Sequence, residues 1–348
     1  MKMANCLSNK FVLLVLLFLN IAAYHNALHN ELRYDQTVVY QGAQIPKFID
    51  RLNFAFLKDI EDKQGILQEL YWFRPIPFMI SWELFKAVDG QPYKINCLNI
   101  LLITITGFLL FNLISCLSGK PFVAFMASIL FCIHPVNGMW VNYAPGGVHG
   151  YIALSLMLLS FLLYIKSIKD GRTFHLYYLS LAVFALGLLS HEIVLFLPIY
   201  MALAVYCLII ERRRESYFLL IPYCVLGGLF LWIRSGVLGT KNILSHGIRM
   251  FSLDGDVYGA TLVKVFLIFI GKLISLQGIV ISWCEPFLRD DRVLLLLTGC
   301  LLFGLLIGLL IFRRQSILSW SIALMFVGFI PVCVGGLLYL SQGLIYEA

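Results

Sequence analysis

Asp35 is the first residue whose type and place in the sequence could support catalysis. It stands in the run Tyr34-Asp35-Gln36, soon after the first strongly apolar stretch of the chain ends. A carboxylate at a membrane surface can take a proton from an acceptor hydroxyl and so act as a general base. The alternative is a solvated loop aspartate that caps a turn.

Arg74 is the second candidate. It lies in the aromatic and proline-rich segment Tyr71-Trp72-Phe73-Arg74-Pro75-Ile76-Pro77, ahead of the second long apolar stretch. Its guanidinium could bind a lipid phosphate through two parallel hydrogen bonds. Basic and aromatic side chains also gather at headgroup depth as ordinary interfacial anchors, so the segment fits either role.

His191 and Glu192 are adjacent at the expected tip of a hairpin between two short apolar stretches. A carboxylate there is costly unless it faces a cavity or a partner, which makes function the default hypothesis. His134, before Pro135, and His149, after a Pro-Gly run, are candidates for lining a polar pocket. Helix breaks at membrane depth are tolerated around such protein-lined cavities. Metal binding by the three histidines and Glu192 is an alternative, although their spacing is not that of a known metal motif.

The composition indicates what must position these residues. The chain has 348 residues, of which 60% are hydrophobic and 13% charged, and its mean hydropathy is +0.87. A soluble domain of this size needs a largely polar exterior, so most of this chain must lie in lipid. A helical span takes roughly 20 apolar residues. We expect about ten such helices, and thus an all-α polytopic membrane protein, with spans near 11–27, 95–117, 121–141, 150–168, 177–193, 195–210, 217–234, 261–283, 293–312 and 317–340.

We expect residues 1–348 to form a single transmembrane domain with no soluble repeat domain. Two sizeable extracytoplasmic loops are expected, 28–94 and 235–260. Within the first loop, four apolar residues recur at helical spacing among charged ones, which predicts an amphipathic helix on the outer membrane surface. They are Ile49, Leu52, Phe56 and Ile60.

Two segments carry further expectations about topology. Residues 142–150 are expected as an outer loop. Residues 261–283 contain Lys264 and Lys272, and a lysine at the centre of a span costs roughly 2.5–3.5 kcal/mol on insertion. This segment is therefore open to three readings: a full span, a re-entrant stretch or an interfacial one.

Charge and cysteine content exclude other classes. The net charge is +7, and most of this excess sits in short connectors, as in the cytoplasmic loops of polytopic proteins. This pattern does not indicate a nucleic-acid partner. Most of the nine cysteines lie within expected spans and form no CxxC pair, so they favour neither disulfides nor a zinc site.

Taken in order, these elements resemble the GT-C superfamily of polytopic glycosyltransferases. The closest resemblance is to the transmembrane, tetratricopeptide-bearing O-mannosyltransferase branch and its bacterial relatives, over roughly residues 30–200. The matching runs are Tyr34-Asp35, Phe73-Arg74-Pro75-Ile76, Tyr93 with Asn96 and Leu98-Asn99, Leu130-Phe131-Cys132-Ile133-His134-Pro135-Val136, and Leu189-Ser190-His191-Glu192 before Leu197-Pro198.

The resemblance implies a membrane transferase that uses a polyprenyl-phosphate-linked sugar as donor on the extracytoplasmic face. The acceptor would be a hydroxyl of a protein Ser or Thr, a glycan or a lipid. Asp35 would be the general base of an inverting displacement, and Arg74, His191 and Glu192 would bind the donor phosphate and lipid. A cation beside the leaving phosphate stabilises its developing charge. The resemblance points to no definite cofactor, and it is compatible with a divalent metal.

Three features differ from the family pattern. Gln36 stands where a second acid is usual, and His191 stands where lysine is common in the mannosyltransferase branch. The chain also ends at Ala348, where the family continues into a further loop. We therefore carry an alternative: a truncated or degenerate, non-catalytic relative that acts as a lipid-binding or assembly partner, or that needs a C-terminal partner chain.

Two further expectations concern class and compartment. A transporter would show ionisable residues near the bilayer midplane and paired repeats, whereas the acids here cluster at the expected outer boundary. The absence of soluble repeats favours a bacterial inner membrane over the endoplasmic reticulum as the host.

Overall fold

The computed structural model describes residues 8–30, 43, 45–57, 73–142, 144–170, 173–208 and 213–238, with single positions farther along the chain. These residues are mostly helical and include no strand. They belong to two compact units. The first comprises Met1–Leu197 and Pro222–Leu238, and the second comprises Pro198–Ile221 and Gly239–Ala348. The helices described in the second unit are most of α10 (Leu197–Leu208) and α11 (Arg213–Phe218).

Four helical stretches in the described ranges are long and apolar enough to cross a membrane, and each coincides with an expected span. They are α1 (Asn9–Tyr24) with the 3-10 turn η2 (His25–His29), α5 (Pro92–Ser118), most of α8 (Ala144–Lys169), and Glu215–Val237, which includes most of α12 (Ile221–Leu238). The chain is thus a helical protein with helices of membrane-spanning length.

Other apolar segments are shorter or bent. A fifth crossing results if α6 (Pro121–Ile133) and α7 (Pro135–Asn142), which meet at a bend of 45°, cross together. Helix α9 (Phe174–Leu188) and the stretch Glu192–Cys207 are apolar but shorter than the four candidate spans. The count of about ten stays a prediction, because the expected spans after residue 260 lie outside the described residues apart from single positions.

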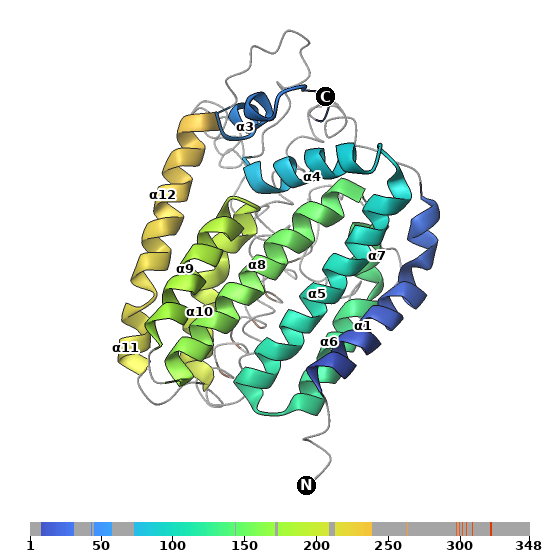
Figure 1. The fold of residues 1–348 in the computed structure, drawn as a ribbon. Helices are drawn as coiled ribbons and strands as arrows, with labels where there is room; N and C mark the ends of the chain where they lie inside the picture. Colours follow the sequence, from blue (N-terminus) through green and yellow to red (C-terminus); the bar gives the residue numbers. More distant parts are fainter. Residues whose placement is uncertain are drawn as a thin grey trace. The chain divides into compact units, whose positions relative to one another are not determined.

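In the first unit, α5 and α8 pack side by side, with α1 and α6 against α5 and α9 against α8 (Figure 1). The hairpin between α5 and α6 follows from local sequence. Gly119 ends α5 in the left-handed region at φ 66°, and Pro121 begins α6. Glycine adopts this conformation without a steric penalty, and proline suits the first turn of a helix.

Helix α4 (Pro75–Ala87) lies inside segment 28–94 and was not expected from the sequence. Its first turn contains two prolines, which are tolerated there because the first N–H groups of a helix have no intrahelical partner. The face carrying Phe78, Trp82 and Phe85 packs with residues at the start of α5 and of α8. Figure 1 shows α4 running crosswise to α5 and α8. Segment 28–94 is therefore partly an ordered, helical layer.

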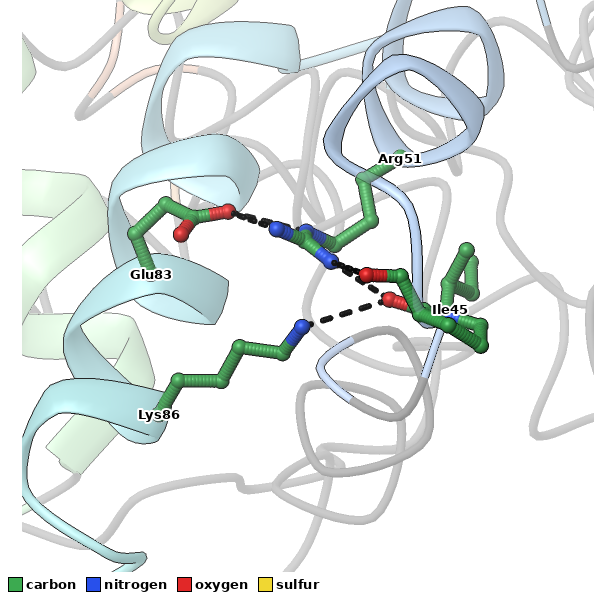
Figure 2. A network of polar contacts seen from close by, with 5 residues as sticks. Ile45, Arg51, Glu83 and Lys86 are labelled. Atoms are coloured by element: carbon green, nitrogen blue, oxygen red, sulfur yellow. Dashed lines mark hydrogen bonds and ion pairs between the residues drawn. The ribbon is translucent and has the colours of Figure 1, made fainter.

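A helix, α3 (Phe48–Leu57), is present where the apolar spacing predicts one, and it packs on α4. Ile60, the last residue of that pattern, lies outside the described residues, and the location of the helix on the membrane surface stays a prediction. Arg51 is only 4% exposed and donates hydrogen bonds to Glu83 through Nε at 2.8 Å and Nη2 at 2.6 Å. It also donates to the carbonyl oxygen of Ile45, which accepts a second hydrogen bond from Lys86 at 3.3 Å (Figure 2). These four residues form what we call the Arg51 clamp. It fixes α3 to α4 through charged groups as well as apolar ones.

The expectation of a loop at 142–150 is wrong, since α7 and α8 leave only position 143 between them; the expected location of this segment on the outer side stays a prediction. Gly147 explains how α8 can begin so early. A Cβ at this position would lie 2.4 Å from the carbonyl oxygen of Trp140 and 2.6 Å from the Asn99 Nδ2. Only glycine allows the first turns of α8 to approach α5 and α7 this closely.

Candidate functional site

Arg74 and Glu192 form a bidentate ion pair, although they are 118 positions apart in the sequence. Arg74 precedes α4, and Glu192 is the first residue of the 3-10 turn η3 (Glu192–Phe196). The Arg74 Nε donates to Oε2 at 3.0 Å, and Nη2 donates to Oε1 at 2.9 Å. The side chains are 14% and 27% exposed. Two parallel charge-assisted hydrogen bonds fix the plane of the guanidinium.

The backbone brings the two partners together. The N–H of Ile76 donates to the carbonyl oxygen of Leu189, at the turn after α9, over 3.3 Å. Phe73 is 2% exposed, and its ring centroid lies 6.0 Å from that of Phe230 on α12. The segment around Arg74 is therefore anchored both to the turn that carries Glu192 and to α12.

His191 shapes the turn that presents Glu192. It is the N-cap of η3, and its Nδ1 accepts a hydrogen bond from the N–H of Ile193 at 3.2 Å. Since Nδ1 is an acceptor here, the neutral ring carries its proton on Nε2. Burial, and then the positive charge of Arg74, lower the pKa of His191 to about 4. The ring is thus neutral at pH 7, and it cannot supply the positive charge that a lysine would.

The carboxyl of Glu192 remains ionised. Burial raises its pKa, but the positive charge of Arg74 and the hydrogen bonds from its guanidinium together outweigh burial and lower the pKa to about 2. The His191 Nδ1 lies 3.6 Å from Oε2, and because the ring is neutral this contact is not an ion pair. Arg74 is therefore the main partner of the carboxylate.

Arg234 on α12 is a member of this site that the sequence analysis missed. Its Nη2 lies 4.0 Å from the Glu192 Oε1, and its side chain is 25% exposed. The sequence does place Arg234 at helical spacing from Tyr223, Gly227 and Phe230, and so on one face of a helix with them. The structure shows that this face is buried. No role was predicted for Arg234 from the sequence. We call Arg74, His191, Glu192 and Arg234 the arginine cluster.

His149 supports the cluster from α8. It is 7% exposed, its Nε2 lies 3.1 Å from the Ser81 hydroxyl, and its ring meets that of Phe78 edge-on at 4.9 Å. It is within electrostatic range of Arg74 and His191. These contacts hold α4 against α8. Its predicted role in lining a pocket stays a prediction.

His134 lies between α6 and α7, at the bend. Its Nδ1 accepts a hydrogen bond from the N–H of Val136 at 3.2 Å, and its carbonyl oxygen accepts one from the Tyr24 hydroxyl at 3.1 Å. These contacts stabilise the bend and tie it to α1. Its predicted role in a pocket is not tested by them.

The predicted base, Asp35, lies outside the described residues. Within the described ranges, His, Cys, Asp and Glu side chains form no group of three or more that could hold a metal ion. The four residues considered for a metal site, His134, His149, His191 and Glu192, accordingly do not gather into one.

The charges of the arginine cluster leave it electropositive. Counted over these four described side chains alone, two arginines, one carboxylate and neutral His191 give one net positive charge. Such an arrangement attracts an anion, and guanidinium groups match the geometry of phosphate and carboxylate oxygens. No protein-family model, curated protein or solved structure matches the chain. What the site binds must therefore be argued from its own chemistry.

Proposed function

We propose that the chain is a membrane glycosyltransferase that moves a sugar from a polyprenyl-phosphate donor to a hydroxyl acceptor on the extracytoplasmic face. The observation that carries the proposal is the arginine cluster, a half-buried, net positive site beside helices of membrane-spanning length. A phosphate attached to a hydrocarbon chain suits this location in two ways, because its negative charge matches the arginines and its apolar chain matches the lipid. We propose the bacterial inner membrane as the host.

The reaction needs a base and a cation. In our proposal the Asp35 carboxylate takes the proton of the acceptor hydroxyl, and the oxygen attacks the anomeric carbon of the sugar. The bond between that carbon and the phosphate oxygen breaks, so the configuration inverts and polyprenyl phosphate leaves with the bonding electrons. The net positive charge of the cluster stabilises the negative charge that develops on the phosphate.

The ion pair between Arg74 and Glu192 supports this role through preorganisation. A cation that is already held in place needs no rearrangement when charge develops beside it. Glu192 acts here as a positioning residue, because it acts on the anion through Arg74. Neutral His191 is available to the donor only as a hydrogen-bonding group.

The test is sugar transfer by membranes that contain the wild-type chain, the Asp35→Asn variant or the Asp89→Asn variant. The donors are radiolabelled polyprenyl-phosphate hexoses, and total membrane extract supplies acceptors. Asp89 is the matched control, because it is an exposed acid in the turn after α4 with φ 51°, a conformation that asparagine tolerates. We expect transfer by the wild type and by Asp89→Asn, and none by Asp35→Asn. Full activity of Asp35→Asn would refute the assignment of the base.

A second candidate is a non-catalytic relative that binds a lipid phosphate as an assembly partner. The observation in its favour is that the arginine cluster can bind an anion without any contribution from Asp35, and that Gln36 replaces an acid usual in the family. It predicts that Asp35 can be changed freely, whereas Arg74 cannot. Binding of a prenyl phosphate without transfer from any donor would favour this candidate.

A further inference from the structure

Arg234 faces protein, although it lies in a candidate membrane span. Tyr223, Gly227 and Phe230 are buried on the same face of α12. The Tyr223 hydroxyl donates to the Ser180 hydroxyl of α9 at 2.7 Å, and the Phe230 ring meets Phe73. Arg234 continues this face by one more turn.

The opposite face of α12 is apolar and open. Val225 is 64% exposed, Leu229 47% and Trp232 73%. An arginine that only anchored the helix end would be expected to turn its guanidinium away from the protein toward the headgroups. Arg234 instead approaches Glu192 to 4.0 Å.

The two arginines are bound to Glu192 with unequal strength. Arg74 makes two hydrogen bonds of normal length to the carboxylate, whereas the distance of 4.0 Å from Arg234 is too long for one. The buried Nε of Arg234 has no hydrogen-bond partner in the part of the chain that the structure describes. An incoming anion would have to break the pair to reach the paired edge of Arg74. It would meet little competition at Arg234.

We propose that Arg234 binds the phosphate of a prenyl phosphate directly, while Glu192 keeps Arg74 in place as a fixed second positive charge. The identity of the ligand rests on the proposed function, but the assignment of Arg234 rests on the geometry of α12 and Glu192. The phosphate of the ligand thus supplies the negative charge that balances Arg234. This explains why Arg234 can be half-buried although Glu192 pairs mainly with Arg74.

The place of Arg234 favours a phosphate carried by a hydrocarbon chain over a free one. It lies in the last turn of Glu215–Val237, a stretch apolar enough to cross a membrane. Free phosphate is strongly hydrated and would have to lose much of its water to bind a partly buried arginine. A prenyl chain adds favourable burial of apolar surface beside α12.

The experiment measures binding to the full chain in nanodiscs of zwitterionic lipid. The probes are farnesyl phosphate, farnesol, inorganic phosphate and phosphatidylglycerol. The variants are Arg234→Gln, Arg234→Lys and, as matched control, Lys166→Gln, which removes an exposed positive charge from the last turn of α8. Thermal melting of each variant reports on its folding. If Arg234→Gln is unstable, Arg234→Lys, which keeps the charge, serves as the test variant instead.

We expect Arg234→Gln to weaken the binding of farnesyl phosphate by about 10- to 100-fold, the range of one charge-assisted contact. Arg234→Lys should lose less, since it keeps the charge but not the fork of donors. Binding of farnesol should be unchanged in every variant, and Lys166→Gln should bind farnesyl phosphate as the wild type does.

Wild-type affinity for farnesyl phosphate in both Arg234 variants would overturn the proposal. Inorganic phosphate or phosphatidylglycerol competing as well as farnesyl phosphate would overturn its choice of a prenyl-borne phosphate. A failure of the proposed function gives a different result. In that case farnesyl phosphate still binds in a manner that depends on Arg234, but no sugar is transferred from any donor. That result supports the assignment of Arg234 and rejects the transferase.

Discussion

At the scale of single residues, one carboxylate organises the candidate site. Glu192 accepts two hydrogen bonds from Arg74 and lies 4.0 Å from Arg234. It begins η3 directly after His191, whose ring caps that turn. Sequence reasoning singled out Arg74, His191 and Glu192, because charged and polar groups beside apolar stretches are costly. It did not show that two of them pair, because nothing local to either residue specifies a partner 118 positions away.

Replacing Glu192 with Gln removes the charge that Arg74 requires while keeping the size of the side chain. A half-buried guanidinium then lacks its counter-charge, so we expect a loss of about 1.5–3 kcal/mol in the free energy of unfolding and a lower melting temperature in detergent. Asp170→Asn is the control, since Asp170 is an exposed acid just after α8. Equal melting of Glu192→Gln and the wild type would show that the ion pair does not contribute to stability.

The stability of the wild type should fall on acidification through a window set by His191. Its pKa is about 4 in the folded chain, below the ordinary 6.5, so the unfolded chain takes up the proton first as the pH falls. Stability is therefore lost between about pH 6.5 and about pH 4. In His191→Asn the amide oxygen can still cap η3 but does not titrate. Melting temperatures across this window should fall less for the variant than for the wild type, and parallel curves would contradict the assignment.

At the scale of elements, the Arg51 clamp shows which contacts of α3 could not be predicted from the sequence. The spacing of its apolar residues correctly indicated a helix, whose apolar side we expected to face the membrane. In the structure Ile49 is 54% exposed, and Arg51 is 4% exposed. The partner that draws Arg51 inward is Glu83 on α4, and α4 was itself not foreseen. The burial of Arg51 therefore depends on a distant charged partner, which the local apolar spacing does not specify.

The two halves of this clamp should differ in importance. Arg51→Met leaves the carbonyl oxygen of Ile45 without its guanidinium donor and removes the charge paired with Glu83. We expect α3 to open more readily, with amide hydrogen exchange over Phe48–Leu57 faster by about tenfold or more. Glu83 is 44% exposed, so water can partly replace its carboxylate, and Arg51 keeps its contacts with the carbonyl oxygens; Glu83→Gln should therefore speed exchange over α3 by less than Arg51→Met does. Equal exchange in the two variants would contradict this description of the clamp.

At the scale of the whole molecule, hydropathy predicted the helices best. Expected spans near 11–27, 95–117 and 150–168 fall within or close to α1, α5 and α8, because long aliphatic stretches leave few alternatives to a helix in lipid. The way in which these helices pack against one another was harder to predict from the sequence. The run Pro145-Gly146-Gly147 indicated a loop. In the structure, Gly147 instead allows α8 to approach Trp140 and Asn99 closely. The same residue types serve loops and tight helix contacts, and tertiary structure decides between them.

For the whole molecule we propose that a positive site next to helices of membrane-spanning length serves sugar transfer from a lipid phosphate. The most direct test is to incubate the purified chain in liposomes with a polyprenyl-phosphate hexose of known anomeric configuration. The product is then analysed by NMR. We predict a glycosylated acceptor with inverted anomeric configuration, together with released polyprenyl phosphate. A product with retained configuration would contradict the single displacement, and prenyl-phosphate binding with no product from any donor sugar would contradict the enzyme assignment itself.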